Sequence, residues 1–307
     1  MKHELLLAEF LATPWALMPE RLNAVATVLA RWSQNAPASL DVLAGIDADK
    51  VAREARRQTA TAVSGGGIAV LPLYGVVTQR GNMVDDVSGP GSVSTQKFAA
   101  ALRQALADES VSQILIDIDS PGGSVYGVAE LADEIVAARA QKPIIAIANS
   151  LAASAAYWIG CSASEFYVTP GGEVGSIGVW QAHFDYSQAL AADGVTPTLI
   201  SAGKYKVEGN PYAPLDADAQ AFMQSRVDDY YLAFCKGVAR GRGAPIAQVR
   251  NGMGQGRVLG AEAAIEQNMV DGVITLDEMI RKMQRNLRNI APTQSRLANA
   301  CRSISIV

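Results

Sequence analysis

The run Ser120-Pro121-Gly122-Gly123 is the first part of this sequence whose residue types suggest chemistry. An apolar stretch, residues 113–118, precedes it and a helical pattern, residues 126–139, follows. Glycine permits a close approach and unusual backbone angles, and a turn that leads into a helix exposes N–H groups and a partial positive charge. Such a turn can receive the oxyanion of an acyl-transfer reaction. Ordinary turn formation explains the same residues, so this element alone leaves both interpretations open.

Ser154 is the second candidate, in the run Ala152-Ala153-Ser154-Ala155-Ala156-Tyr157. It follows a predicted strand, residues 143–148, and begins a predicted short helix, residues 154–160. Small neighbours leave room for a substrate backbone, and the start of a helix supplies oriented N–H donors near Oγ. The alternative is a plain helix cap, a position that serine favours.

A serine hydroxyl becomes a good nucleophile only when a base removes its proton, and the sequence offers two kinds of base. The first is His183, since the only other histidine is His3. The second is Lys204 or Lys206, in a glycine-flanked segment that ends in a turn at residues 209–211. A lysine acts as a base when burial favours its neutral form. Spacing alone selects none of these side chains.

Composition limits the class of protein. The chain has 307 residues, of which 49% are hydrophobic, and 26 basic residues nearly balance 30 acidic ones. We therefore expect one large or two small domains and no sequence-specific binding of nucleic acid. Three cysteines, Cys161, Cys235 and Cys301, lack metal-ligand spacing, which predicts a reducing compartment and no metal.

The N-terminus does not resemble a secretory signal, because Glu4 and Glu9 bracket the short apolar run, residues 5–7. No stretch reaches the roughly 18 apolar residues of a membrane helix. We therefore expect a soluble, cytoplasmic protein without a membrane partner.

Three regions are expected along the chain. Residues 1–63 are predicted to form an Ala-rich helical extension, which ends at the glycines of residues 65–67. Residues 64–278 are predicted to form the main domain. Residues 279–307 contain several arginines and no acid, and they are predicted to form a solvated basic tail.

Within the main domain, short apolar strands alternate with helices, which predicts an α/β architecture with a largely parallel sheet. Strands are expected at residues 68–77, 113–118, 143–148, 165–168 and 174–180, with an extended segment at 197–201. Helices are expected at residues 96–107, 126–139, 154–160, 186–192 and 216–240, and a short strand, helix and strand at residues 256–273. The loop at residues 78–94 is predicted to border the substrate groove.

Four motifs in a fixed order make the interpretation specific: Ser-Pro-Gly-Gly (120–123), Ala-Ala-Ser-Ala-Ala-Tyr (152–157), Gly-Ser-Ile-Gly-Val (175–179) and Gly-Lys-Tyr-Lys-Val-Glu-Gly-Asn-Pro-Tyr (203–212). The combination resembles the S49 peptidases, which include signal peptide peptidase A and the prohead or minor capsid protein C proteases of bacteriophages. The resemblance covers roughly residues 66 to 275.

This resemblance implies a ClpP/crotonase-like fold and a Ser/Lys dyad that uses no cofactor. Ser154 matches the nucleophile and Lys206 the general base, at a separation that suits signal peptide peptidase A; Lys204 is a poorer match. The N–H groups of Gly123 and Ala155 match the oxyanion-hole donors. Ser176 matches a serine that orients the lysine, and His183 falls where the family requires no histidine.

The resemblance also implies partners. The N-terminal extension and the Gly-Asn-Pro-Tyr run resemble the phage branch, whose members cut scaffold, portal or capsid proteins in proheads. A homo-oligomeric ring is expected, with the helix at residues 216–240 as a candidate contact. A cytosolic bacterial protease similar to signal peptide peptidase A, a crotonase-like acyl-CoA enzyme and a head-assembly protein without catalysis are the alternatives.

Overall fold

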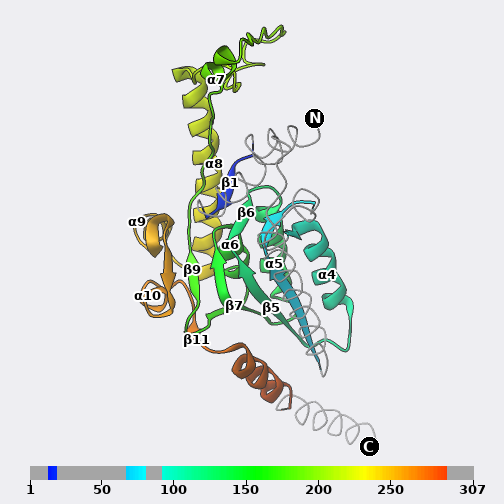
Figure 1. Ribbon diagram of the computed structural model, residues 1–307. Coiled ribbons are helices and arrows are strands. Elements are labelled where there is room, and N and C mark those ends of the chain that lie inside the picture. Colours follow the sequence, from blue (N-terminus) through cyan, green and yellow to red (C-terminus); the bar gives the residue numbers. More distant parts are fainter. Residues whose placement is uncertain (1–12, 19–66, 81–91, 289–307) are drawn as a thin grey trace, which may run out of the picture.

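The computed structural model describes residues 13–18, 67–80 and 92–288, and Figure 1 shows the arrangement of their elements. The central sheet contains β2 (Ile68–Tyr74), β5 (Gln113–Ser120) and β7 (Ile144–Ala153), which run parallel to one another. Their nearly continuous Ile, Leu, Val and Ala content is typical of strands covered on both faces. The expected α/β architecture with parallel strands is therefore confirmed.

The sheet continues on the far side of β7. The first half of β7 pairs with β8 (Glu165–Val168), and its last three residues pair with β9 (Glu173–Gly175). Beyond these lie β10 (Val258–Gly260), antiparallel to β9, and β11 (Gly272–Val273), parallel to β8. The strand predicted at residues 174–180 is thus shorter, and the one at 143–148 is longer.

A second, four-stranded sheet has the order β1-β6-β3-β4. Its strands are β1 (Trp15–Leu17), β6 (Gly122–Ser124), β3 (Val76–Thr78) and β4 (Ser92–Ser94). The single strand predicted at residues 68–77 is wrong, because Gly75, with φ of 80°, divides it between the two sheets. The prediction of an entirely helical segment 1–63 is also wrong, because Trp15–Leu17 form a strand.

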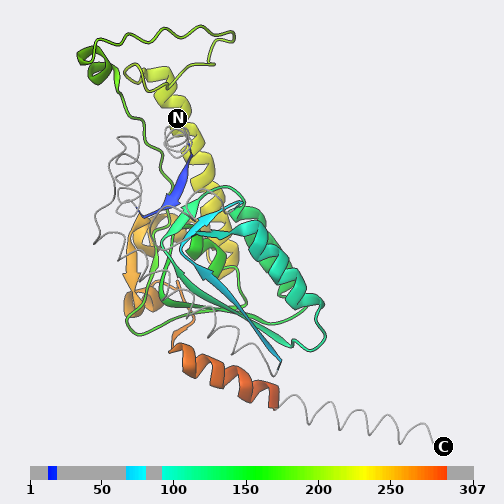
Figure 2. The same cartoon turned by 45° about the vertical axis from the view of Figure 1, so that its right-hand side comes forward.

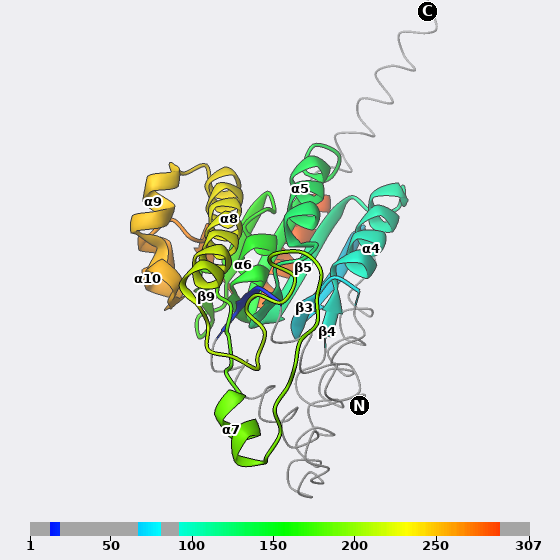
Figure 3. The ribbon, with the colours of Figure 1, turned by 90° about the horizontal axis from the view of Figure 1, so that it is seen from above.

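Helices cover one face of the central sheet (Figure 3). These are α4 (Thr95–Ala107), α5 (Val128–Ala138), α6 (Ala155–Gly160) and part of α8 (Ala217–Arg242). The Ser94 side chain caps α4 by accepting from the Lys97 N–H at 3.2 Å. Smaller helices α7 (Ser187–Ala192), α9 (Ile246–Asn251) and α10 (Ala261–Glu266) and a 3-10 turn, Met253–Gly256, complete this part. The helices predicted between residues 96 and 240 are confirmed to within a few residues.

The opposite face of the sheet is covered by a helical segment, residues 276–288. Met279 and Met283 are fully buried there against the sheet, in a cluster that includes Leu115 and Ile147. The solvated tail predicted from residue 279 is therefore wrong for residues 279–288, because apolar side chains alternate with the basic ones and face the sheet. The rest of that tail lies outside the described residues, as do most of the predicted extension 1–63 and residues 81–91 of the predicted loop.

The long helix α8 is anchored at one end only. Phe234 stacks on Trp158 of α6 with ring centroids 4.9 Å apart, and a Cβ on Gly237 would come within 2.1 Å of Trp158 Nε1. The other end projects away from the sheets and carries residues 181–216, including α7 (Figures 1 and 2). We call residues 181–216 the arm. Among the described helices, none is long and apolar enough to cross a membrane.

Candidate active site

Ser154 occupies the tight turn between β7 and α6. Its backbone angles, φ 57° and ψ −118°, lie outside the regions that non-glycine residues favour. Such strain costs about 1–3 kcal/mol and persists where the surrounding structure imposes it. A strained turn from strand to helix is also how hydrolases present a nucleophilic serine. The predicted position of Ser154 at the start of the short helix is confirmed.

The backbone around Ser154 is fixed on both sides. Its N–H donates to the Gly175 carbonyl at 2.6 Å, and its own carbonyl accepts from the Trp158 N–H at 3.0 Å. Ser176, the residue predicted to orient the lysine, directly follows Gly175. It has φ of 54°, and its N–H donates to the Arg257 carbonyl at 2.8 Å. The structure thus places Ser176 beside the turn that holds Ser154.

Gly122 and Gly123 approach the same turn from β6. A Cβ on Gly122, which has φ of 96°, would lie 2.8 Å from Ser154 Cβ and 2.9 Å from the Ala153 carbonyl oxygen. A Cβ on Gly123 would lie 1.9 Å from the Val77 carbonyl oxygen of β3. Only glycine fits at either position. Ala155, the other predicted oxyanion donor, is fully buried as the first residue of α6.

The hydroxyl of Ser154 is buried and makes no hydrogen bond with the described residues. The residue is 1% exposed, and its Oγ has no hydrogen-bond partner among the described residues. A buried hydroxyl without a partner costs free energy, so such a group calls for an explanation. Neither Ser176 nor the predicted bases His183 and Lys206 hydrogen-bonds to it in this chain.

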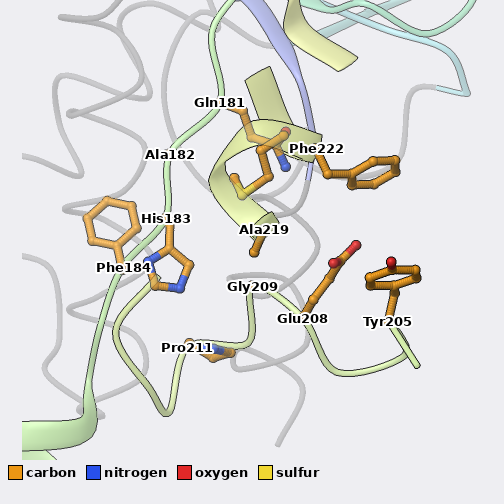
Figure 4. A pocket seen from close by; sticks show the side chains of 11 residues that line it. Gln181, Ala182, His183, Phe184, Tyr205, Glu208, Gly209, Pro211, Ala219 and Phe222 are labelled. Carbon is orange, nitrogen blue, oxygen red and sulfur yellow. The ribbon is translucent and has the colours of Figure 1, made fainter. Parts of the chain in front are cut away.

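Lys206 lies on the arm, far from Ser154. Its neighbours Tyr205 and Glu208 line a pocket of about 400 Å³ together with Ala219 and Phe222 from the outer turns of α8 (Figure 4). From Ala219 to Gly237, where α8 packs on α6, the helix rises about 27 Å at 1.5 Å per residue. The Lys206 side chain is exposed to solvent. A single chain therefore does not bring the predicted base to the predicted nucleophile.

The histidine alternative is also placed on the arm. His183 lines the pocket of Figure 4, and its Nε2 is 3.1 Å from the Asn210 carbonyl oxygen. This contact supports a structural role that joins two segments of the arm. Lys204 lies over the Tyr205 ring, with Nζ 4.6 Å from the ring centroid. No residue pattern in the sequence indicated this pocket, because its walls come from three separate segments.

The two cysteines in the described part of the chain are not suited to act as nucleophiles. Burial raises the pKa of the Cys161 thiol to about 12, so this residue stays protonated. Cys235 is also buried, and burial raises its pKa too. Within residues 13–18, 67–80 and 92–288, no group of His, Cys, Asp and Glu side chains could hold a metal ion.

Comparison with known proteins gives a family and several relatives. The model of Peptidase family S49 matches residues 126–290, a span that contains Ser154, Ser176 and Lys206. The chain is 36% identical to Head-tail preconnector protein GP5 of Enterobacteria phage P21, over 73% of this chain and 44% of the phage protein. It is also 36% identical to Capsid assembly protease C of Escherichia phage lambda, over 71% of this chain and 49% of that protein.

A bacterial protein is similar as well. Protease 4 of Salmonella typhi is 29% identical over 71% of this chain and 34% of its own length. The chain spans about half the length of the phage relatives that it matches. The family model alone covers more than half of the chain, including the strained serine turn. The resemblance seen in the four motifs is thereby confirmed, and this chain belongs to peptidase family S49.

Proposed function

We propose that this chain is a serine endopeptidase, with Ser154 as nucleophile and Lys206 as general base, on a ClpP/crotonase-like domain that spans residues 64–278. The observation that carries the proposal is the buried Ser154 hydroxyl, which has no partner among the described residues and lies on a strained turn beside a glycine strand. A serine with only a capping or structural role has no need of this strain.

Two backbone N–H groups are suited to stabilise the tetrahedral intermediate. Gly123 comes from β6, whose Gly122 packs against Ser154, and Ala155 is the first residue of α6, directly after Ser154. Each such donor is worth about 3 kcal/mol in the transition state. The close packing of Gly122 against Ser154 and of Gly123 against Val77 fixes β6 next to the serine turn, which supports this role.

Lys206 reaches Ser154 only if it comes from another copy of the chain. The arm carries Lys206 to the outside of the molecule. Apolar side chains face solvent there: Ile200 of the arm is 95% exposed, and Tyr205 of the arm and Phe222 of the adjoining α8 are more than half exposed. We propose a head-to-tail arrangement in which each arm enters the next copy; such a contact forms a ring when the rotation between copies closes. Burial in the neighbour's cleft would also favour the neutral amine that a base requires.

The reaction then follows from these positions. The Lys206 amine accepts the Ser154 Oγ proton while Oγ attacks the scissile carbonyl carbon, and the N–H groups of Gly123 and Ala155 stabilise the oxyanion. Ser176 hydrogen-bonds to the amine and orients it. The lysine returns the proton to the leaving amine, and water hydrolyses the acyl-enzyme.

The substrates are proposed from the names of the relatives. Capsid assembly protease C and a head-tail preconnector protein are both phage head proteins by name. We therefore propose a head maturation protease that cuts scaffold, portal or capsid proteins in the host cytoplasm and inside proheads.

Cleavage of casein tests the proposal, with wild type compared with Ser154→Ala, Lys206→Ala, Lys204→Ala and His183→Ala. Loss of activity in the first two variants, with Lys204→Ala and His183→Ala still active, is the expected result. Lys204→Ala is the matched control, since it removes the same charge two residues away. An active Lys206→Ala protein would overturn the dyad, and an inactive wild type would favour a head-assembly role without catalysis.

A further inference from the structure

The chain's own segment, residues 13–18, lies along the strand that carries the proposed oxyanion donor. Strand β1 pairs antiparallel with β6 in the register Trp15↔Ser124, Ala16↔Gly123 and Leu17↔Gly122. The Met18 N–H donates to the Pro121 carbonyl at 3.2 Å, and the Val125 N–H donates to the Pro14 carbonyl at 3.3 Å. The segment is therefore bound to β6 over its whole length.

The other edge of the same segment is held by Trp180. The Trp15 N–H donates to the Trp180 carbonyl at 2.9 Å, and the Trp180 N–H donates to the Trp15 carbonyl at 3.0 Å. In addition, Trp180 Nε1 donates to the Leu17 carbonyl at 3.0 Å. Residues 15–17 thus lie between two backbones, an arrangement in which strand addition holds an extended peptide.

The Ala16 carbonyl faces the proposed oxyanion donor. Hydrogen-bonded pairs alternate along an antiparallel ladder, and the bonds at Met18–Pro121 and Pro14–Val125 make Ala16 and Gly123 the hydrogen-bonding pair between them. The register therefore sets the Gly123 N–H opposite the Ala16 carbonyl oxygen. This is the position that the carbonyl of a bond under attack must take.

The same carbonyl lies beside the nucleophile. A Cβ on Gly122 would be 2.3 Å from the Ala16 oxygen and 2.8 Å from Ser154 Cβ. The distance between the Ala16 oxygen and Ser154 Cβ is therefore no more than the sum of these two distances. Ala16 and Ser154 are each 1% exposed. The Ala16 carbonyl therefore occupies the space beside Ser154 and Gly122 that the carbonyl of another peptide would need.

We infer that residues 13–18 occupy the substrate cleft and that the Ala16–Leu17 bond is a self-cleavage site. The inference rests on the proposed function. It also defines a substrate class, which is an extended segment like Trp15-Ala16-Leu17. The residue on the acyl side of the cut is small, and the residues before and after this small residue are bulky and apolar.

The chemistry is the ordinary hydrolysis of a peptide bond. The Ser154 Oγ–Ala16 carbon bond forms as the Ala16–Leu17 bond breaks, and the hydroxyl proton passes through the Lys206 amine to the Leu17 nitrogen. Water then hydrolyses the ester, which regenerates Ser154, leaves Ala16 with a carboxylate and gives the main fragment a new N-terminus at Leu17.

Intact mass measurement and N-terminal sequencing of the purified full chain test this inference. Wild type should convert over time to a species that begins at Leu17, and Ser154→Ala should remain whole. Two substitutions at one position sharpen the result: Ala16→Gly keeps a small residue and should still be cut, whereas Ala16→Glu places a charged side chain at a buried position and should abolish this cut.

Casein cleavage by the same samples separates the proposed endopeptidase activity from the inferred self-cleavage. A wild type that cuts casein but keeps the Ala16–Leu17 bond overturns the inference and leaves the proposed function standing. A cut at this bond in Ser154→Ala overturns it too, because another protease is then responsible. Inactivity toward casein together with an intact chain overturns both claims.

Discussion

The two proposed catalytic residues lie in different parts of the molecule. One is in the body, by which we mean the two sheets and the helices packed against them, and the other is on the arm. In the body, Ser154 is buried and fixed by backbone contacts from β6, β9 and α6. On the arm, Lys206 is exposed at the outer end of α8, in a segment joined by turns and a few hydrogen bonds. One chain thus fixes the proposed nucleophile in its body but leaves the proposed base exposed on its arm.

This contrast predicts opposite results for substitutions in the two regions. Changes to the closely packed residues around Ser154 should lower the free energy of unfolding and the activity together. Changes on the arm should leave the free energy of unfolding unchanged and lower only the activity, because the arm contributes little to the core of its own chain.

The largest effect is expected at Gly123. Gly123→Ala would place a Cβ 1.9 Å from the Val77 carbonyl oxygen, which β6 can avoid only by moving away from β3. We expect loss of peptide cleavage and a decrease of about 3 kcal/mol or more in the free energy of unfolding, measured in urea. Gly171→Ala is the matched control, since nothing lies within 4 Å of its Cβ position; equal stability of the two variants would contradict this packing.

A smaller effect, confined to activity and assembly, is expected at Ile200. Its side chain is 95% exposed on the arm, and we expect it to contact the neighbouring copy. Ile200→Asp should change the free energy of unfolding by no more than about 0.5 kcal/mol, while sedimentation shows weaker assembly and casein cleavage falls. Unchanged assembly and unchanged activity would remove the arm from the proposed interface.

A third effect, on stability alone, concerns the pH dependence that Asp271 gives to the body. Burial of Asp271 acts to raise its pKa, but hydrogen bonds from Arg242, at 2.8 Å to each oxygen, and from the Phe166 N–H, at 2.7 Å, outweigh burial and lower it. A lowered pKa stabilises the fold above the carboxyl's unfolded value of about 3.9, and this contribution is lost as the pH falls through the folded value.

Asp271→Asn should therefore lower the free energy of unfolding at pH 7 by about 2 kcal/mol, since a charge-assisted pair is lost. Thermal melts between pH 7 and pH 3 measure the effect: the difference between wild type and variant should shrink toward the acid end. A difference that stays constant across this range would show that the carboxylate charge is not its source.

The sequence allowed the body to be predicted better than the arm. The apolar run of residues 113–118 and the small residues around Ser154 are local signals, and local signals identify strands and tight turns. The segment that carries Lys206 has turn residues but no pattern that fixes its direction, which depends on where α8 leaves the core. The family resemblance indicated Lys206 as the base, but it did not indicate where this residue lies relative to Ser154.

Two features of the described fold, strand β1 and the pocket around His183, have no local pattern in the sequence that predicts them. Trp15–Leu17 are too few residues for an alternating pattern to reveal a strand, and their partner β6 was itself predicted to be only a turn. The pocket around His183 joins segments that lie apart in sequence. Both depend on tertiary contacts, which residue spacing along a chain does not contain.

The central claim is that Ser154 of one copy and Lys206 of its neighbour form one active site. Mixing the Ser154→Ala and Lys206→Ala variants tests this claim most directly. Ser154→Ala supplies Lys206, and Lys206→Ala supplies Ser154, so a site that joins two copies should regain activity when the variants assemble together. In a ring with random neighbours, about a quarter of the sites should then hold both residues, and casein cleavage should recover to a similar fraction of wild type. A mixture that forms common oligomers yet stays inactive would contradict a site shared between copies.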